Sequence, residues 1–219
     1  MIRQGIGVGL VLVLSLSAIS AQQKGAGHSR LFPPSDLGLL DAPDRDLWQR
    51  PDLIMDSMGI ADGSVVADIG AGSGWFTIRL ARRVGPQGLV YAEDVQQEMI
   101  NAISRRVSRE GFNNVKEVLG TINDPKLRAQ SIDAALMVDS FHEVAAADRA
   151  TMLANLGKAL KPQGRLGIVD FRLDGTGPGP APEERVGPDV VLTAAKEAGL
   201  KLLRQEPFLE YQYFLIFGK

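Results

Sequence analysis

Residues 65–74 read Val-Val-Ala-Asp-Ile-Gly-Ala-Gly-Ser-Gly, an apolar, β-branched run that leads directly into three glycines separated by single small residues. After them Phe76, Leu80 and Val84 recur at the spacing of one helix face, and Gly85 ends the pattern. A strand, a glycine turn and a helix in this order bring a backbone without Cβ atoms close to a ligand, and they direct N–H groups of the helix at its negative end. The stretch therefore predicts the ligand-binding turn of an α/β fold.

Apolar runs alternate with helical patterns through the rest of the chain. Further strands are predicted at residues 89–92, 115–119, 132–138 and 165–169. Strands that alternate with helices indicate βαβ units, in which a parallel sheet carries helices on both faces. The last two predicted strands, residues 200–204 and 211–217, are too close together for a helical crossover, so we expect them to pair as an antiparallel hairpin.

The composition is that of one globular domain with appendages. The 219 residues include 45% hydrophobic and 23% charged residues, and none is cysteine. Without cysteine, disulfides, thiolate-ligated metals and thiolate nucleophiles are excluded, which leaves histidine and carboxylates as metal ligands. The chain has 24 Lys and Arg against 26 Asp and Glu, a net charge of −2, so no overall positive field draws it to a phosphate backbone. We therefore expect no nucleic-acid partner.

The N-terminus has the pattern of a secretory signal peptide. Arg3 precedes an apolar run over residues 6–19, and the small residues Ser20 and Ala21 follow, so we predict cleavage after one of these two positions. The apolar run is shorter than the ~20 residues that span a bilayer, which disfavours a retained signal anchor. We expect no membrane span after cleavage. The resulting division is a signal at residues 1–21, a tether or lid at residues 22–45 and a folded domain at residues 46–219.

Two acidic residues indicate which ligand the glycine turn binds. A nicotinamide-binding turn needs a further glycine at position 75, where this chain has Trp75. Asp68, two residues before the first glycine, would repel a pyrophosphate but accept a hydrogen bond from an ammonium group. Asp94, which follows the next predicted strand, suits the two hydroxyls of a ribose. A cation near the turn and a ribose at the second strand fit S-adenosyl-L-methionine better than NAD.

With this turn and three further segments, the chain resembles the class I S-adenosylmethionine-dependent methyltransferases. The matching segments are residues 65–74, 90–95 with 98–99, 132–144 and 160–166, and the resemblance covers about residues 48–217. It implies a Rossmann-like three-layer α/β sandwich with a seven-stranded, mostly parallel sheet and an antiparallel last strand. Residues 43–48 and 211–214 are also similar to a subgroup of methyltransferase-domain proteins with an N-terminal signal sequence.

The resemblance implies that the carboxyl edge of the sheet holds the cofactor. The residues that would hold its methionine end are Asp68, Gly70, Gly72 and Gly74. Asp94 would bind the ribose hydroxyls, and Val95 would pack on the adenine. A structural alternative exists for both acids, since Asp68 and Asp94 also stand where a carboxylate can cap the following helix.

The adenine and sulfonium ends are assigned to residues that follow strands three and four. Where the family often has Gly-Asp, this chain has Gly120-Thr121, so Thr121, or Asn123 and Asp124, would contact the adenine amino group. Asp139 would lie near the sulfonium, since open α/β sheets bind ligands at the carboxyl ends of their strands. These positions complete the predicted cofactor site.

His142 is the candidate catalytic residue, because it is the one histidine of residues 46–219 and falls at the mouth of the site. A neutral imidazole there would deprotonate an acceptor, and the alternative is a packed or solvated histidine. Asp139 and Asp170 end strands four and five and so resemble the metal ligands of catechol-type O-methyltransferases. That pattern needs Asp-Asn where this chain has Asp170-Phe171, so we predict no metal.

These features predict in-line transfer of the sulfonium methyl group to a small-molecule acceptor, which residues 39–48 and 172–185 would cover. For the second segment the alternative is a plain surface loop. The alternative function is a protein that binds S-adenosylmethionine or S-adenosylhomocysteine without turnover, because the signal predicts export to the periplasm or the medium, away from the compartment where the cofactor is made. A cytoplasmic location is the second reading. The sequence predicts neither the identity of the acceptor nor an oligomeric state.

Overall fold

The structure, a computed structural model, describes Met1 and residues 31–175 and 177–219. Apart from Met1, the predicted signal peptide at residues 1–21 lies outside the described residues, and so do residues 22–30 of the predicted tether. Within the described part of the chain, no helix has the length and hydrophobicity that crossing a bilayer requires.

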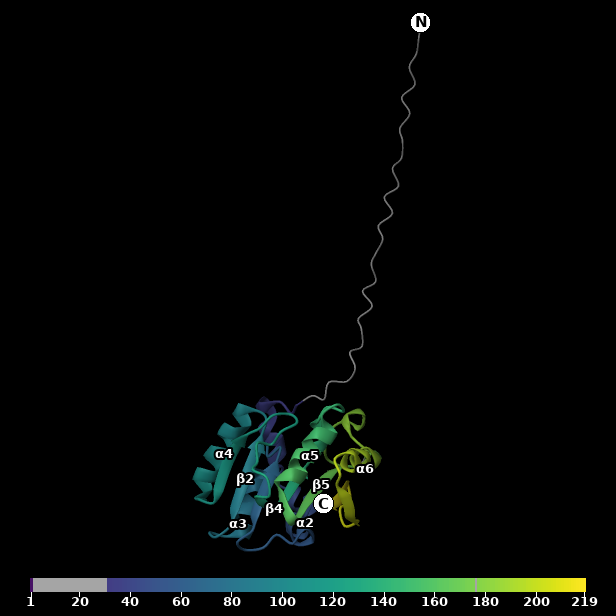
Figure 1. The fold of residues 1–219 in the computed structure, drawn as a ribbon. Coiled ribbons are helices and arrows are strands. Elements are labelled where there is room, and N and C mark those ends of the chain that lie inside the picture. The colour runs from purple at the N-terminus through teal and green to yellow at the C-terminus, as the bar shows by residue number, and fades with distance from the viewer. Residues whose placement is uncertain (2–30, 176) are drawn as a thin grey trace.

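Seven strands form one sheet, as the sequence predicts. They are β1 (Val65–Ile69), β2 (Leu89–Asp94), β3 (Val115–Leu119), β4 (Ile132–Val138), β5 (Leu160–Phe171), β6 (Lys201–Glu206) and β7 (Gln212–Gly218). Their order across the sheet is β3-β2-β1-β4-β5-β7-β6 (Figure 1). Neighbouring strands are parallel except at β7, which runs antiparallel to both β5 and β6. The predicted mostly parallel sheet and its antiparallel C-terminal hairpin are confirmed.

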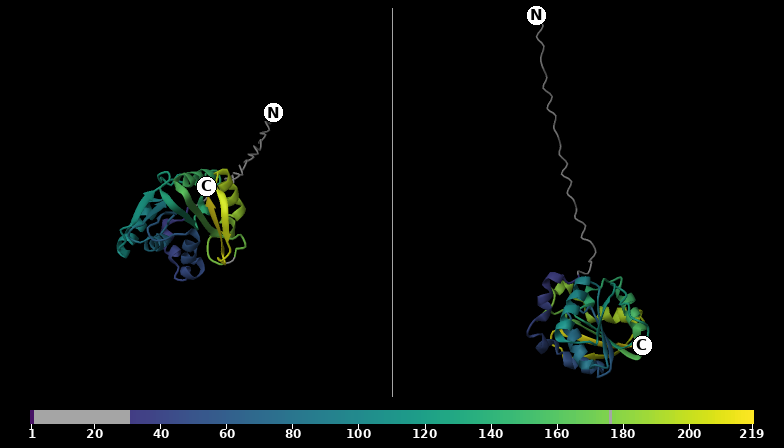
Figure 2. Two further views of the ribbon diagram at one scale, coloured as in Figure 1. Left: turned by 60° about the horizontal axis from the view of Figure 1, so that its bottom comes forward. Right: turned by 90° about the vertical axis from the view of Figure 1, so that its left-hand side faces the viewer.

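Helices cover both faces of this sheet (Figure 2). The α-helices are α1 (Arg45–Gln49), α2 (Pro51–Met58), α3 (Trp75–Val84), α4 (Gln97–Glu110), α5 (Arg149–Ala159) and α6 (Pro188–Glu197), and the 3-10 helices are η1 (Pro34–Asp41), η2 (Phe141–Glu143) and η3 (Pro182–Glu184). Side chains of α2 and α3 share a core with Val66, whereas those of α5 and α6 share another with Ala67. Successive strand residues point to opposite faces, so β1 supplies both cores and lies in the middle of the predicted three-layer sandwich.

β5 is longer than the predicted strand at residues 165–169. It begins at Leu160, which is fully buried and pairs with Ile132, and a register shift then follows, after which Ala134 pairs with Arg165. At its other end Asp170 and Phe171 stay in the sheet, because they pair with the first two residues of β7. This extension places Asp170 and Phe171 at the carboxyl edge, where the site forms.

The position of that site follows from the winding of the chain. β1 lies between β2 and β4, and the helices that follow β1 and β4 pack on opposite faces of the sheet. In open α/β sheets this reversal opens a crevice outside the carboxyl ends of the strands, and ligands bind there.

Candidate functional site

A pocket of about 1010 Å³ opens at the carboxyl ends of β1, β2, β4 and β5. Small-molecule sites commonly enclose roughly 300–1,000 Å³, so this one has room for a cofactor together with a second small molecule. Its walls also include residues within the ranges 31–48 and 178–186. The two segments that the sequence predicts to cover the acceptor therefore both contribute to the pocket.

The glycine turn needs glycine for two physical reasons. Gly70, Gly72 and Gly74 have φ angles of 67°, 56° and 77°, a left-handed region that disfavours other residues. A Cβ atom on Gly70 would also lie 2.6 Å from the Cβ of Ser140, and one on Gly72 would lie 2.9 Å from Cδ1 of Leu40. Gly70 and Gly72 line the pocket, whereas Gly74 is the N-cap residue of α3 and supports the turn.

Asp68 is buried in β1 and lines the pocket beside the turn. Its Oδ2 accepts a hydrogen bond of 2.6 Å from the hydroxyl of Thr77 in α3. The backbone of Thr77, in the first turn of α3, also donates to this carboxylate, so part of the capping alternative is present although the N-cap residue itself is Gly74. Burial raises the pKa of Asp68 to about 6, against the opposing effects of Thr77 and Arg45.

Asp94 joins the glycine turn to the start of α4. Its Oδ2 accepts from the backbone N–H of Gly72 at 2.9 Å, and its Oδ1 accepts from the N–H of Gln96, the N-cap residue of α4, at 2.9 Å. Part of the capping alternative is thus present. Burial raises the pKa of Asp94, and both Asp94 and Val95 line the pocket.

The residues predicted to contact the adenine are placed differently. Thr121 is exposed and bridges to the backbone of Asp124, because the chain turns immediately after β3. Asn123 donates to the carboxylate of Asp148, and Asp124 pairs with Lys126. None of these three lines the pocket in the structure. Ile122 is the residue of this turn that reaches the pocket.

Asp139 is held by a closed ring of buried side chains. Arg45 in α1 pairs with Asp139 at 2.9 Å and donates through Nε to Gln49 at 2.9 Å. Gln49 donates to Gln212 of β7 at 2.8 Å, and Gln212 donates to Asp139, which closes the ring. Burial raises the pKa of Asp139 to about 6 although Arg45 opposes it, and burial lowers the pKa of Arg45.

Trp75 forms a wall of the pocket next to this ring. The guanidinium of Arg45 lies 4.3 Å from the centre of the Trp75 rings, and that of Arg79 lies 3.4 Å from it. Cations over an aromatic face are stabilised by the ring quadrupole. Sequence reasoning missed Arg45, although it lies in the quoted segment at residues 43–48.

His142 is paired with Asp170 at the carboxyl ends of β4 and β5. Its Nδ1 lies 2.8 Å from Oδ1 of Asp170, and its backbone N–H donates to Oδ2 at 2.9 Å. Burial lowers the pKa of His142, but the hydrogen bond and charge of Asp170 outweigh it and raise the pKa to about 9. The raised pKa favours the protonated imidazole in the free protein, whereas the base that the sequence suggests needs the neutral form. Sequence reasoning considered Asp170 only as a metal ligand and missed this partner.

Two glutamates of the pocket were also missed. Glu93 is 1% exposed, its Oε2 accepts from the N–H of Gly70, and its Oε1 finds no partner among the described residues. A Cβ on Gly120 would lie 1.8 Å from that Oε1, which explains the glycine after β3. Burial raises the pKa of Glu93 to about 8 and that of Glu143 to about 7. Across the described residues no group of three or more His, Cys, Asp or Glu is arranged to hold a metal ion.

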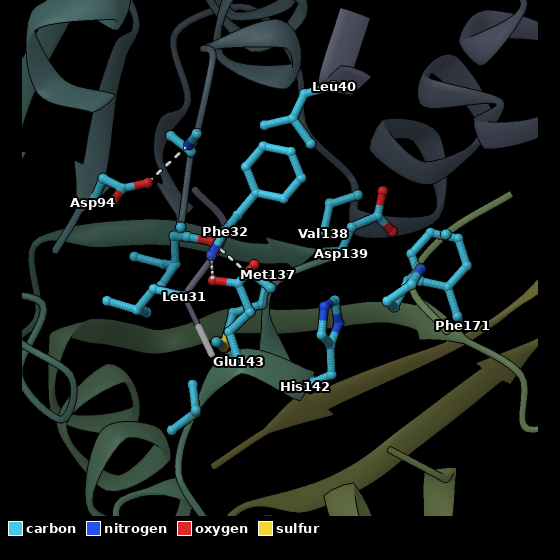
Figure 3. A pocket seen from close by; sticks show the side chains of 18 of the residues that line it. Leu31, Phe32, Leu40, Asp94, Met137, Val138, Asp139, His142, Glu143 and Phe171 are labelled. Carbon is cyan, nitrogen blue, oxygen red and sulfur yellow. Dashed lines mark hydrogen bonds between the residues drawn. The ribbon is translucent and has the colours of Figure 1, made fainter. Parts of the chain in front are cut away.

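Residues 31–41, called the strap from here on, cross the mouth of the pocket. The N–H of Phe32 donates to Oε2 of Glu143 at 3.2 Å, and its carbonyl accepts from Nε2 of Gln96 at 3.0 Å. Figure 3 shows Phe32 in this position, close to Leu31 and Glu143. Asp41 anchors the other end of the strap through an ion pair with Arg106 at 2.8 Å. The strap is therefore tied to η2 and α4.

Arg185 organises the segment on the opposite side of the pocket. Its guanidinium donates to the carbonyls of Arg172, Pro178 and Pro180, and it lies 5.4 Å from the centre of the Phe171 ring. The Phe171 ring also packs against Trp48, with ring centres 6.3 Å apart. Phe171 thus joins α1, β5 and the loop after β5 into one wall.

Comparison with known proteins gives a matching family model and three similar proteins. A family model described as a methyltransferase domain matches residues 66–164. A solved structure of a SAM dependent methyltransferase from Aquifex aeolicus is 30% identical, with a TM-score of 0.80 over 85% of this chain and 98% of that one.

Two curated proteins are similar over a shorter stretch. The ubiquinone/menaquinone biosynthesis C-methyltransferase UbiE of Pasteurella multocida is 30% identical over 57% of this chain and 46% of its own length. The nocamycin O-methyltransferase of Saccharothrix syringae is 30% identical over 60% of this chain and 44% of its own. The chain thus spans about half the length of these relatives.

Proposed function

The chain belongs to the class I S-adenosylmethionine-dependent methyltransferase family, and from this premise we propose that it transfers a methyl group from S-adenosyl-L-methionine to a small-molecule acceptor. The observation that carries the proposal is the placement of Asp68 and Asp94 on either side of the glycine turn, in a pocket with room for two small molecules. The curated relatives are a C-methyltransferase and an O-methyltransferase, which supports a small-molecule acceptor.

The charges of the pocket fit this cofactor, whose methionine end carries an ammonium and a sulfonium. Burial raises the pKa of Asp68 and that of Asp139 to about 6, because each carboxylate is removed from water without full compensation. A bound cation would compensate both. Gly70 and Gly72 line the pocket without Cβ atoms, so a ligand can approach the backbone of the turn closely.

Each lining residue then has a task. The bound cofactor supplies an electrophilic methyl group, and the chain holds the acceptor in line with it and excludes water. We assign the methionine end to Asp68, Gly70 and Gly72 with Gly74 in support, the ribose to Asp94, the adenine to Val95 and Ile122, and the sulfonium side to Asp139. His142 lies on the acceptor side.

Isothermal titration calorimetry with S-adenosylmethionine and S-adenosylhomocysteine tests the cofactor site. We expect both to bind and Asp68→Asn to weaken binding about tenfold or more, because a charge-assisted hydrogen bond is lost. Asp52→Asn, at an exposed acid of α2, is the matched control. If neither compound binds, the proposal fails. Conversion of the cofactor in the presence of phenols, amines and carboxylates then separates an enzyme from a binding protein.

One observation favours the second candidate, a protein that binds the cofactor without turnover. The strap is tied to Gln96 and Glu143 across the mouth of the pocket, so a ligand beneath it would exchange slowly. A binding protein tolerates slow exchange, whereas turnover requires product release. Cofactor binding without methylation of any acceptor class would favour this candidate.

We also propose that the chain is exported by a signal at residues 1–21 and acts in the periplasm or the medium. The apolar run at residues 6–19 and the small residues after it support this. Expression of the full chain in a bacterial host, with mass spectrometry of the periplasmic fraction, should show an N-terminus at residue 21 or 22. An uncleaved chain in the cytoplasm would favour the cytoplasmic alternative.

A further inference from the structure

Three N–H groups converge on the carboxylate of Asp170, which is 0% exposed. Its Oδ2 accepts from the backbone of His142, and its Oδ1 meets the ring nitrogen Nδ1 at 2.8 Å and accepts from the N–H of Phe171 at 2.8 Å. The carboxylate thus fixes both the backbone and the ring of His142. Because Nδ1 donates to Asp170, the ring's other nitrogen, Nε2, is left for chemistry.

Nε2 of His142 faces the pocket. The side chain is 11% exposed and lines the pocket, and its Nε2 has no hydrogen-bond partner among the described residues. Figure 3 shows the ring directed into the cavity between Glu143 and Phe171. The ring meets Phe171 edge to face with centres 6.3 Å apart, and Trp48 packs on Phe171 from α1. A molecule that reaches Nε2 therefore also meets an aromatic wall.

We propose that His142 and Asp170 form a dyad that removes the proton from a phenolic acceptor, with His142 as the catalytic base and Asp170 as the positioning residue. This inference rests on the proposed methyl transfer and deepens it, because it names the acceptor class. The step runs through the neutral form of His142, which predominates only above its pKa of about 9. In it, the hydroxyl proton passes to the unprotonated Nε2 while the phenolic oxygen bonds to the methyl carbon. The carbon–sulfur bond breaks, and its electron pair stays on sulfur, which becomes a neutral thioether.

The electrostatics of the dyad select for such an acceptor. Burial lowers the pKa of His142, but Asp170 of β5, Glu143 of η2 and Asp139 after β4 raise it, and the net pKa is about 9. Phenols have a pKa near ~10, so proton transfer to this base is nearly balanced. A carboxylic acid, with a pKa near ~4, is already ionised and needs no base. An ammonium acceptor would bring a further cation beside the sulfonium, which is unfavourable.

Other charged groups near the dyad do not replace its carboxylate. Arg149 of α5 lies over Phe141 and donates to the carbonyl of Val144, and Arg185 is committed to three loop carbonyls. Both are cations that line the pocket, and a cation there stabilises a phenolate as it forms. Asp170 is therefore the group whose removal should change the basicity of His142 most.

NMR titration of the imidazole nitrogens tests the dyad without cofactor or acceptor. The chain has two histidines, His28 and His142, so a His28→Ala variant leaves one imidazole to follow. We expect His142 to titrate near pH 9 and its midpoint to fall by about two units in Asp170→Asn, because Asn accepts a hydrogen bond without a charge. A midpoint near ~6.5 in the native protein, or one that Asp170→Asn leaves in place, would overturn the dyad.

Kinetics with a panel of simple phenols test the role of the dyad in transfer. We expect His142→Gln to lower the rate about 10²–10⁴-fold and Asp170→Asn to move the acidic limb of the pH–rate profile to lower pH, since the limb reports the base. A structural role of Asp170 would not move that limb. Phenol methylation that survives His142→Gln at full rate, or cofactor binding with methylation of amines but not of phenols, would refute the proposal.

Calorimetry with S-adenosylhomocysteine distinguishes failure of the dyad proposal from failure of the proposed methyl transfer. Absence of binding in the native protein would remove the proposed methyl transfer and the dyad's role together. If His142→Gln and Asp170→Asn both bind S-adenosylhomocysteine within about twofold of the native protein but no longer methylate phenols, the result supports the dyad's role in transfer. Thermal unfolding of each variant is the folding control. A transition as cooperative as that of the native protein shows that the variant is folded, so that loss of turnover has another cause.

Discussion

The guanidinium of Arg45 and the carboxylate of Asp139 form an ion pair of 2.9 Å between α1 and the end of β4, with side chains only 9% and 13% exposed. The pair connects α1 to the residue that we assign to the sulfonium side of the pocket. Gln49 and Gln212 complete its hydrogen bonds, so neither charge is left bare. Such pairs are costly to break from one side, because the remaining charge stays buried.

We predict that Arg45→Met lowers the free energy of unfolding by about 3–5 kcal/mol, the usual cost of leaving a buried partner unpaired. Urea denaturation measures the loss. Arg83→Met is the matched control, since Arg83 pairs with Asp52 and Asp56 at the surface, and it should cost no more than about 1 kcal/mol. Equal and small losses in both variants would show that the buried pair is not stabilising α1.

How much of this site the sequence predicts depends on how local each signal is. The glycine turn and Asp94 were found because strand, turn and helix follow one another within residues 65–94, and such patterns are read directly from periodicity. The ring around Asp139 joins positions 45, 49, 139 and 212, and no pattern in a single sequence connects them. The same holds for His142 and Asp170, which the sequence places at the ends of two different strands without indicating that their side chains pair. Thr121 does not line the pocket, because the turn after β3 closes on Asp124, and the strand pattern gives no sign of this closure.

Gly70→Ala should remove cofactor binding. It should also lower the free energy of unfolding by more than an alanine does at a left-handed position with open space around it. The new Cβ would lie 2.6 Å from Ser140, whose hydroxyl is held by the carbonyl of Ile69. Gly111→Ala is the control, because Gly111 has a similar φ of 74° at the end of α4 but open space around it. We expect Gly111→Ala to cost about 1–2 kcal/mol in denaturant unfolding and to leave calorimetric binding unchanged.

Glu93 should make the protein less stable as pH rises. Burial raises its pKa in the folded state to about 8 from an ordinary value near 4.5, so between these two values the folded state holds a proton that the unfolded state has released. The free energy of unfolding therefore falls as pH rises through this window, and the loss is complete above the folded pKa. Glu93→Gln removes the titration. Urea unfolding at several pH values from about 5 to 9 should give a flatter curve in Glu93→Gln than in the native protein.

The surface acid Glu110, at the end of α4, supplies the control for that comparison. Glu110→Gln should leave the slope of stability against pH as in the native protein. If Glu93→Gln and the native protein lose stability in parallel, the slope arises elsewhere.

Cofactor affinity should rise with pH from about 5 to 7. Burial raises the pKa of Asp68 and that of Asp139 to about 6, and a cationic ligand favours their ionised forms, so binding below this value must expel protons. Calorimetry of S-adenosylmethionine binding in two buffers of different ionisation enthalpy measures the protons released. Asp68→Asn should bind more weakly and release fewer protons. An affinity that is level across this range would argue that Asp68 does not meet the cationic end.

The strap should control how fast the cofactor leaves the pocket. Phe32 is held by one hydrogen bond from Gln96 and one to Glu143, and a hydrogen bond of this kind stabilises by about 1 kcal/mol, or roughly fivefold in an opening equilibrium. Gln96→Ala should therefore raise amide hydrogen exchange in residues 31–41 about fivefold and speed release of S-adenosylhomocysteine in stopped-flow measurements by a similar factor. Gln97→Ala is the control, because the side chain of the neighbouring Gln97 is exposed and bonds to Asn101 along α4, with no bond to the described residues of the strap. If Gln96→Ala speeds amide hydrogen exchange in the strap but not ligand release, the ligand leaves by another opening. If Gln96→Ala and Gln97→Ala have equal effects, the bond from Gln96 to Phe32 does not hold the strap. If both rates rise in Gln96→Ala alone, the strap is the gate, and the bond from Gln96 to Phe32 contributes to the slow exchange that favours a binding protein.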